Sequence, residues 1–262
     1  MTTDQNIVKL ISHTLFPLQL VAYAARVCKN SVHKSDTPAV LLMGGLQPKE
    51  AELKDLVLVG HKDRTLIEKC LIEKHESIFE HPNFTFQIHF SRAMQAQMLR
   101  HRLASYSAES SRAVDMSETT DNTQRFFIPH TIKHHTLGAD IKPARVMFWE
   151  CVERCMSTYR DMIQVGIPVE DARYVLPMAL MQPVVMTMNI RQWRHVIAER
   201  TCKHAQFEIR YVVKEIRRMF NEIDPLFMQD AEKYDSCIHR DTCGRCLTNW
   251  EGMEENDSIK EI

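Results

Sequence analysis

Residues 84–112 read FTFQIHFSRAMQAQMLRHRLASYSAESSR, and this stretch decides the fold of the chain. Apolar and polar residues alternate through residues 84–90, which is the period of two that is typical of a half-buried β-strand. Ser91 is a suitable N-cap for a helix that we expect to follow the strand. That helix should end near residues 100–102, and the serine-rich remainder should be a loop.

The end of this stretch carries the donors that phosphate oxygens require. Arginine and histidine offer fixed or switchable positive charge, and serine hydroxyls add further donors. An anion-binding surface is the first interpretation; the alternative is an ordinary helix end, where basic side chains and serines are also common. The donors are Arg100, His101, Arg102, Ser105, Ser107, Ser110, Ser111 and Arg112.

The composition narrows the class of protein. A chain of 262 residues with 44% hydrophobic content can bury a substantial core. Its formal net charge of -1 gives no global basic field, so we expect anions to be bound by a local cluster and do not expect nucleic acid as a partner. No apolar run approaches the roughly 20 residues of a membrane span, and no secretion signal is recognisable. We therefore expect no membrane association, a cytoplasmic protein, and eight cysteines that are mostly reduced and buried.

Helical patterns flank the strand on both sides, and residues 31–50 read as a surface excursion. An extended run at residues 184–188 ends at Asn189, which is a good helix cap. Helices combined with an antiparallel sheet make an α+β fold. The predicted helices are 16–29, with a stripe of Leu20, Val21, Ala24, Ala25 and Cys28, then 66–75, 92–100, 143–166, 168–177 and 191–220.

Arg200 lies on the stripe of the last helix that should be buried, together with Trp193 and Ile197. A buried arginine needs an anionic or strongly polar partner, so either a carboxylate or a ligand should meet it. Glu199 is expected to point elsewhere on the helix.

The C-terminal tail suggests a different kind of site. Two residues separate Cys243 from Cys246, as in a zinc knuckle, but Cys237 and His239 are too close together for the commonest zinc-finger pattern. We divide the chain into a catalytic domain at 1–230 and a Cys/His-containing tail at 231–262. A nucleotide or nucleic-acid binding protein with a zinc-stabilised tail is therefore the alternative function.

Several blocks of the sequence, including residues 100–112, resemble those of a known family. Residues 100–112 match the signature of the flavin-dependent thymidylate synthases at both arginines of the triplet, its histidine, Ser105, Ser110 and Arg112. FEHPNFTF around His81, ARYVLP around Arg173 and residues 189–210 resemble three further blocks, so the resemblance covers about residues 21–219. It is closest to phage or bacterial members.

The chain departs from the signature at two positions. Ala108 stands where a Glu or Gln is frequent, and Ala113 stands where a Tyr is usual. Glu109 could replace the lost polar group at the pyrimidine, and a solvent-facing Glu109 is the alternative.

The resemblance implies reductive methylation of dUMP to dTMP, with NADPH reducing FAD and methylenetetrahydrofolate donating the carbon. It also implies an α+β fold of long helices on an antiparallel sheet, and a homotetramer with shared sites. It implies neither a metal nor a cysteine nucleophile. The flavin-contacting residues would be His81, Arg100, His101, Arg102, Asn189, Arg191 and His195. The nucleotide-binding residues would be Gln97, Ser107, Ser110, Ser111, Arg112, Arg173 and Arg200, with Arg200 and Ser110 as the catalytic candidates.

Glycine usage agrees with that implication. The chain has only seven glycines and no G-x-G-x-x-G or G-K-[ST] string, so the usual glycine-rich phosphate loops are missing. Side chains must then bind the phosphates, and arginine forks suit that task.

Overall fold

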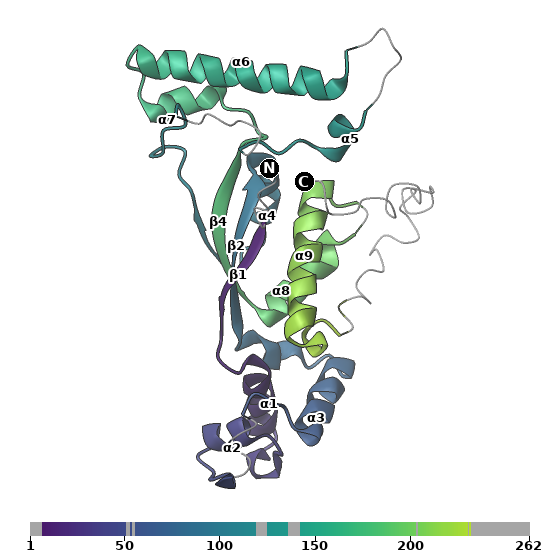
Figure 1. Ribbon diagram of the computed structural model, residues 1–262. Helices are drawn as coiled ribbons and strands as arrows, with labels where there is room; N and C mark the ends of the chain where they lie inside the picture. Colours follow the sequence, from purple (N-terminus) through teal and green to yellow (C-terminus); the bar gives the residue numbers. More distant parts are fainter. Residues whose placement is uncertain are drawn as a thin grey trace.

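The computed structural model describes residues 7–50, 53, 56–118, 125–135, 142–202, 204–229 and 231. Within them, four antiparallel strands form one sheet in the order β1-β2-β4-β3 (Figure 1). Helices pack on this sheet, so the α+β prediction is confirmed. The strands are β1 (Val8–His13), β2 (Asn83–Ser91), β3 (Ser105–Ala108) and β4 (Met181–Asn189).

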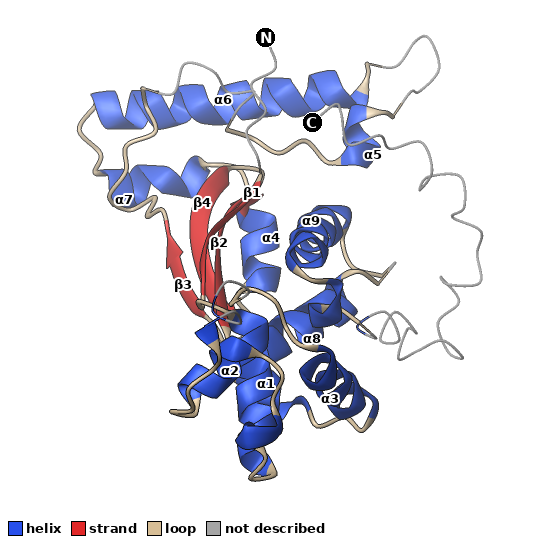
Figure 2. Ribbon diagram, turned by 60° about the horizontal axis from the view of Figure 1, so that its bottom comes forward, coloured by secondary structure: helices blue, strands red, loops and turns tan. Residues whose placement is uncertain are grey.

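Strand β2 is the centre of the core. Phe84, Phe86, Ile88 and Phe90 are all fully buried, as the alternating pattern predicted. They face the layer formed by α4 (Arg92–Met98), α8 (Ile190–Arg200) and α9 (Phe207–Ile223) (Figure 2). The intervening residues of β2 point to the other face of the sheet and are only half-buried.

The remaining helices lie at the two ends of the sheet (Figure 1). Helices α1, α2 and α3 gather at one end, and α6 crosses the other end above α7. None of the helices in the described part of the chain is long and apolar enough to cross a membrane. Their bounds are α1 (Pro17–Cys28), α2 (Pro38–Met43), α3 (His61–Ile72), α5 (His130–Lys133), α6 (Ala144–Gln164) and α7 (Val169–Ala172). Short 3-10 helices are η1 (Val32–Lys34), η3 (Glu76–Glu80), η5 (Arg173–Val175) and η6 (Pro225–Phe227).

A buried ion pair corrects the predicted face of α1. Arg26 is 8% exposed, and its Nε lies 2.7 Å from Oδ1 of the fully buried Asp63 on α3. This pair turns the helix, so Leu20 and Ala24 are only half-buried and Cys28 is exposed, contrary to the predicted stripe. Residues 31–50 are also more than a surface excursion, because they contain η1 and α2.

The predicted single helix over residues 191–220 is wrong, because two helices occupy this region. Helix α8 ends at Arg200, where the Thr201 hydroxyl donates to the Ile197 carbonyl at 2.7 Å, and α9 begins at Phe207. Satisfying that carbonyl at the helix end allows the chain to turn. At the start of α8, Asn189 Oδ1 accepts a hydrogen bond from the Gln192 N–H, so the predicted cap is confirmed.

A second apolar cluster lies under α6. Val152, Met156 and Tyr159 are buried on the predicted stripe of this helix, and they pack against Phe126 and Leu180. The Tyr159 hydroxyl donates to Asp115 Oδ1 at 3.1 Å. The helix therefore fastens the segment after β3 to the end of the sheet.

The expectation of mostly buried cysteines is wrong for the described part of the chain. Of its five free cysteines, only Cys70 is buried; Cys28 and Cys151 are exposed, and Cys155 and Cys202 are half-buried. Cys151 and Cys155 lie one turn apart on α6, and burial together with the neighbouring Cys151 raises the pKa of the Cys155 thiol.

Ser91 joins α4 to α9 and should be one of the more sensitive polar positions. Its hydroxyl accepts from the Met94 N–H at 3.1 Å and donates to Glu208 Oε2 at 2.6 Å, and its own N–H donates to Glu208 Oε1 at 2.7 Å. Ser91→Ala should lower the free energy of unfolding by about 2 kcal/mol, because it removes a cap and leaves a buried carboxylate oxygen unpaired. Urea denaturation at fixed protein concentration measures this. The exposed Ser157 on α6 provides the control, since Ser157→Ala should change stability by less than about 0.5 kcal/mol. Equal effects of the two substitutions would contradict the prediction.

Candidate active site

His101 is the buried member of the Arg-His-Arg triplet. It follows α4 directly, where its N–H donates to the Met98 carbonyl at 3.1 Å, and it is 5% exposed. Tyr106 on β3 fixes this turn, because its hydroxyl lies 3.0 Å from the Met98 carbonyl and 2.8 Å from the His101 carbonyl. Burial raises the pKa of Tyr106 to about 12, so this hydroxyl remains a donor at neutral pH.

Arg200 meets His101 from the end of α8. Its Nε donates to His101 Nε2 at 2.9 Å, so the partner that it has within the chain is a histidine and not the predicted carboxylate. Arg200 is also half-buried rather than buried. Glu199 also faces this group: its Oε2 lies 4.0 Å from His101 Nδ1 and its Oε1 lies 3.4 Å from His195 Nε2. The expectation that Glu199 points elsewhere is therefore wrong. Its position four residues after His195 was the available signal.

The charge of His101 also differs from the expectation. Burial, together with the neighbouring positive charge of Arg200, lowers its pKa to about 4, with Glu199 opposing and His195 adding to the shift. His101 is therefore neutral at physiological pH and contributes hydrogen bonds rather than charge. Arg100 and Arg102 on either side are exposed, and neither forms an ion pair with another described residue.

One potential metal-ligand atom from each of His101, His195 and Glu199 lies within 4.8 Å of the other two, which is close enough to suggest a metal site. The hydrogen bond from Arg200 argues against that use. A neutral imidazole that accepts at Nε2 carries its proton on Nδ1, which is the nitrogen nearest Glu199. A metal on Nδ1 would move the proton of the neutral ring to Nε2, where it would point at the Arg200 Nε–H. The arrangement as built suits hydrogen bonding.

The predicted flavin-contacting residues lie along α8 and near its two ends. Arg191 and His195 are exposed on one face of the helix, and with Glu199 they span about 12 Å of its length. Arg191 forms an ion pair with Glu80, and its Nε lies 3.8 Å from Glu76 Oε2. His81 lies at the start of the helix, because the Ile190 N–H donates to the carbonyl of the next residue, Pro82. The group is thus divided, with His81, Asn189 and Arg191 at one end of α8 and His195, Arg100, His101 and Arg102 at the other.

Part of the serine-rich segment is a strand, which corrects the predicted loop. Strand β3 pairs with β4 so that Ser105 lies opposite Thr187 and Ser107 opposite Val185. Alternation places both serines on the face of the sheet that α8 and α9 do not cover, while Tyr106 points to the covered face. Arg200 and Ser107, both predicted to bind the nucleotide, are therefore on opposite sides of one chain's sheet.

Glu170 of α7 brings two other predicted nucleotide-binding residues together. The Arg112 Nε donates to its carboxylate at 2.6 Å, and the Arg173 Nε donates to its backbone carbonyl at 3.0 Å. Arg112 is exposed and Arg173 is half-buried, so a ligand anion could replace these contacts. Nothing in the sequence pattern singled out Glu170.

The other predicted residues have different surroundings. Ser110 is exposed, whereas Ser111 is buried and accepts a hydrogen bond from the Arg92 guanidinium at 2.6 Å. The side-chain amide of Gln97 donates a hydrogen bond to Gln206 Oε1, at the residue that precedes α9. Ser111 is therefore held by its own chain, while Ser110 is accessible.

The alternative of a solvent-facing Glu109 without a contact is wrong, because Glu109 has a partner. Its Oε1 lies 3.4 Å from Arg125 Nη1, and its side chain is 18% exposed. Burial lowers the pKa of the nearby His89, and the charges of Glu109 and Arg125 act on it in opposite directions. The neighbouring Ala108 and Ala113 are exposed.

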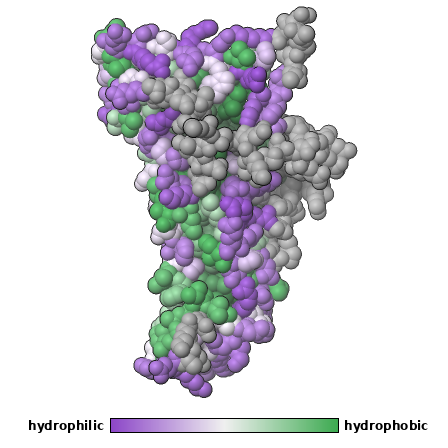
Figure 3. All heavy atoms as spheres, in the orientation of Figure 1, coloured by the Kyte–Doolittle hydropathy of each residue, from purple (hydrophilic) through white to green (hydrophobic). Residues whose placement is uncertain are grey.

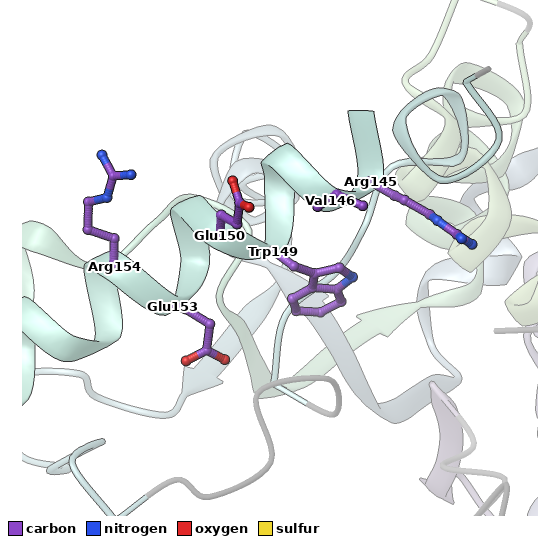
Figure 4. Close-up of a pocket in the computed structure, with 6 residues that line it drawn as sticks. All are labelled: Arg145, Val146, Trp149, Glu150, Glu153 and Arg154. Atoms are coloured by element: carbon purple, nitrogen blue, oxygen red, sulfur yellow. The ribbon is translucent and has the colours of Figure 1, made fainter. Parts of the chain in front are cut away.

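A hollow of about 820 Å³ lies elsewhere, along α6 (Figure 4). All six lining residues belong to this one helix, with the Trp149 indole in the middle and Glu153 and Arg154 at one end. It contains none of the predicted site residues. The Cys/His cluster proposed for zinc, at residues 237–246, lies outside the described residues.

The low pKa of His101 predicts a pH dependence of stability. The ordinary value is 6.5 and the native value is about 4, so between them the unfolded chain binds the proton more tightly. The stabilisation is complete above pH 6.5 and is lost as the pH falls toward 4, amounting to about 3 kcal/mol over the whole window.

Urea denaturation of the wild type and His101→Gln across pH 4.5 to 7 measures this contribution as the difference between the two proteins. The difference should shrink as the pH falls. Ser157→Ala, at an exposed site with no titratable group, should show no such trend. A constant difference for His101→Gln would contradict the assignment of a neutral buried imidazole.

Comparison with known proteins agrees with the sequence resemblance. Residues 9–226 match the family model described as thymidylate synthase complementing protein. A protein of Geobacter sulfurreducens named flavin-dependent thymidylate synthase is 33% identical over 86% of each chain. Proteins of the same name from Nitratidesulfovibrio vulgaris and Thermococcus onnurineus are 32% and 31% identical, over 91% and 78% of this chain and 94% and 74% of their own. These relatives come from both bacteria and archaea, so the expected phage or bacterial origin of the chain stays a prediction. The chain belongs to the family of flavin-dependent thymidylate synthases.

Proposed function

We propose that this protein converts dUMP to dTMP by reductive methylation, with methylenetetrahydrofolate as the carbon donor and NADPH as the reductant through FAD. Membership of the family supports the reaction. The observation within the chain that carries the proposal is the Arg200–His101 hydrogen bond, because it joins one predicted nucleotide-binding residue to one predicted flavin-contacting residue.

The exposed donors fit a cofactor with a diphosphate. Arg100 and Arg102 follow α4, and Arg191 and His195 line α8, so basic side chains border an extended surface rather than one point. Arginine forks bind phosphate oxygens in the absence of a glycine-rich loop. When bound, the flavin supplies the hydride chemistry, and the chain has to position it and the nucleotide.

Arg200 is suited to the electrostatic part of the reaction. His101 occupies its Nε and is its only hydrogen-bond partner among the described residues, so both Nη groups can face a pyrimidine oxygen. A fixed guanidinium favours negative charge that develops on the ring during attack. Ser110 is exposed and could orient the pyrimidine, but no described base activates it as a nucleophile.

A homotetramer with shared sites is part of the proposal. Ser107 and Arg200 face opposite sides of the sheet, so a second subunit would have to bring such residues to one nucleotide. Large apolar side chains are also exposed, among them Leu15, Val57 and Leu58 at 73%, 75% and 64%. Figure 3 shows apolar surface on the part of the molecule below the sheet. Surfaces of this kind are typical of protein interfaces.

The remaining parts of the proposal concern the chain as a whole. We assign residues 1–230 to the catalytic domain and 231–262 to a tail, in which zinc binding stays a prediction. A cytoplasmic location is retained because the proposed co-substrates are metabolites of that compartment.

The direct test starts from the colour of the purified protein. Bound FAD should give flavin absorbance, NADPH should bleach it without oxygen, and adding methylenetetrahydrofolate with dUMP should yield dTMP, identified by mass. A colourless protein that does not bind added FAD would overturn the proposal in favour of the nucleotide-binding alternative.

Replacing Arg200 should separate catalysis from flavin binding. Arg200→Lys keeps the positive charge but loses the planar fork, so turnover should fall by at least about 100-fold while the flavin content is unchanged. Cys202→Ala, two residues further on, should stay active because no thiol nucleophile is required. Full activity of the Lys variant would refute the argument for the fork.

Glu109 is proposed to meet the polar edge of the pyrimidine or sugar, in place of the side chains missing at Ala108 and Ala113. Its ion pair with Arg125 would orient the carboxylate. Glu109→Ala should weaken dUMP binding several-fold, as measured by titration of the flavin-loaded protein. An unchanged affinity would restrict Glu109 to its contact with Arg125.

A further inference from the structure

We propose that Glu199 is a positioning residue, which selects the tautomer of His101 that accepts the hydrogen bond from Arg200 and thereby fixes the guanidinium. This inference rests on the proposed function of Arg200. It assigns a role to a side chain that is not among the predicted flavin-contacting or nucleotide-binding residues.

The first step is the direction of the Arg200–His101 hydrogen bond. An arginine Nε–H is always a donor, so His101 Nε2, at 2.9 Å, must offer a lone pair. The proton of the neutral ring is then on Nδ1. In the other tautomer, two N–H groups would point at each other across this distance, and Arg200 would lose its partner.

The second step is the group that favours the proton on Nδ1. The carboxylate of Glu199 lies 4.0 Å from Nδ1, on the side of the ring opposite to Arg200. A negative charge there favours an N–H that points toward it, and the hydrogen bond of one ring nitrogen sets the role of the other. The separation is longer than a hydrogen bond, so Glu199 acts through its charge or after a small movement of a side chain that is 39% exposed.

The other charged neighbours of His101 cannot replace Glu199. Arg200 is a cation and His195 carries no negative charge, so neither can attract the Nδ1 proton. Both lower the pKa of His101. Tyr106, from β3, uses its hydroxyl on backbone carbonyls. Arg100 and Arg102, on either side of His101 in the chain, are positively charged as well. Glu199 is thus the one carboxylate that acts on the ring among the described residues, and His195 Nε2 at 3.4 Å holds it in place.

A double-mutant cycle tests whether Glu199 acts through His101. Glu199→Gln removes the charge with little change of shape, and in the flavin-loaded full-length protein it should lower kcat about tenfold with the KM for dUMP and the flavin content unchanged. The glutamine of the His101→Gln variant has no tautomers, and its amide oxygen can accept from Arg200 near the position of Nε2. In that background Glu199→Gln should therefore have no further effect on kcat.

Matched variants make this result specific. Glu199→Asp retains the charge and should recover part of the lost kcat. Glu222→Gln removes an exposed carboxylate that pairs with Arg218 on α9, and it should leave kcat unchanged. If Glu199 only forms a surface pair with His195, Glu199→Gln will not change kcat, and the inference is overturned. Loss of flavin together with kcat, or an equal effect of Glu199→Gln in both backgrounds, would also overturn it.

A second readout does not depend on catalysis. In protein labelled with ¹⁵N-histidine, the His101 signals, identified by their loss in His101→Gln, should show protonated Nδ1 in the wild type and a shift toward protonated Nε2 in Glu199→Gln. An unchanged tautomer would refute the inference even if the protein is a thymidylate synthase. The expected shift in a protein without synthase activity would instead reject the proposed function alone.

Discussion

The hydrogen bond between Arg200 and His101 is the interaction on which the candidate site depends, and it joins residues 99 positions apart in the sequence. It exists only while His101 is neutral, because an imidazolium could not accept from a guanidinium. Neutrality in turn requires burial, which the turn after α4 and the Tyr106 hydroxyl on β3 provide. Packing on one face of the sheet therefore decides the chemistry available at its edge.

The sequence predicted the central parts of the fold better than its edges. Strand β2 is recognisable because a covered face and a less covered face give a strict alternation, and β4, its full-length partner, was recognised in part. The edge strands β1 and β3 were missed. Ser105 and Ser107 on β3 look like loop residues, and only pairing with β4 makes them a strand. The rotation of α1 was missed as well, because it depends on Asp63 from another helix.

The site shows the same division between local and tertiary information. The caps at Ser91 and Asn189 were predictable because a cap involves only the next turn of the chain. That Arg200 needs a polar partner was also predictable, but the identity of the partner was not. The error over Glu199 arose because helical spacing relates it to His195 alone, whereas His101 reaches it from a distant segment.

Helix α9 acts as the frame for both halves of this contact. Glu208, in its first turn, holds Ser91 at the start of α4, whose other end leads to His101. Beyond its last turn, the carbonyls of Phe227 and Gln229 accept from the buried Arg194 of α8 at 2.7 and 2.9 Å, six residues before Arg200. A chain that binds phosphates with side chains from several elements, rather than with one glycine-rich loop, must fix those elements relative to one another. In this protein Glu208 and the carbonyls that follow α9 meet that requirement, because they join α9 and the turn after it to α4 and α8.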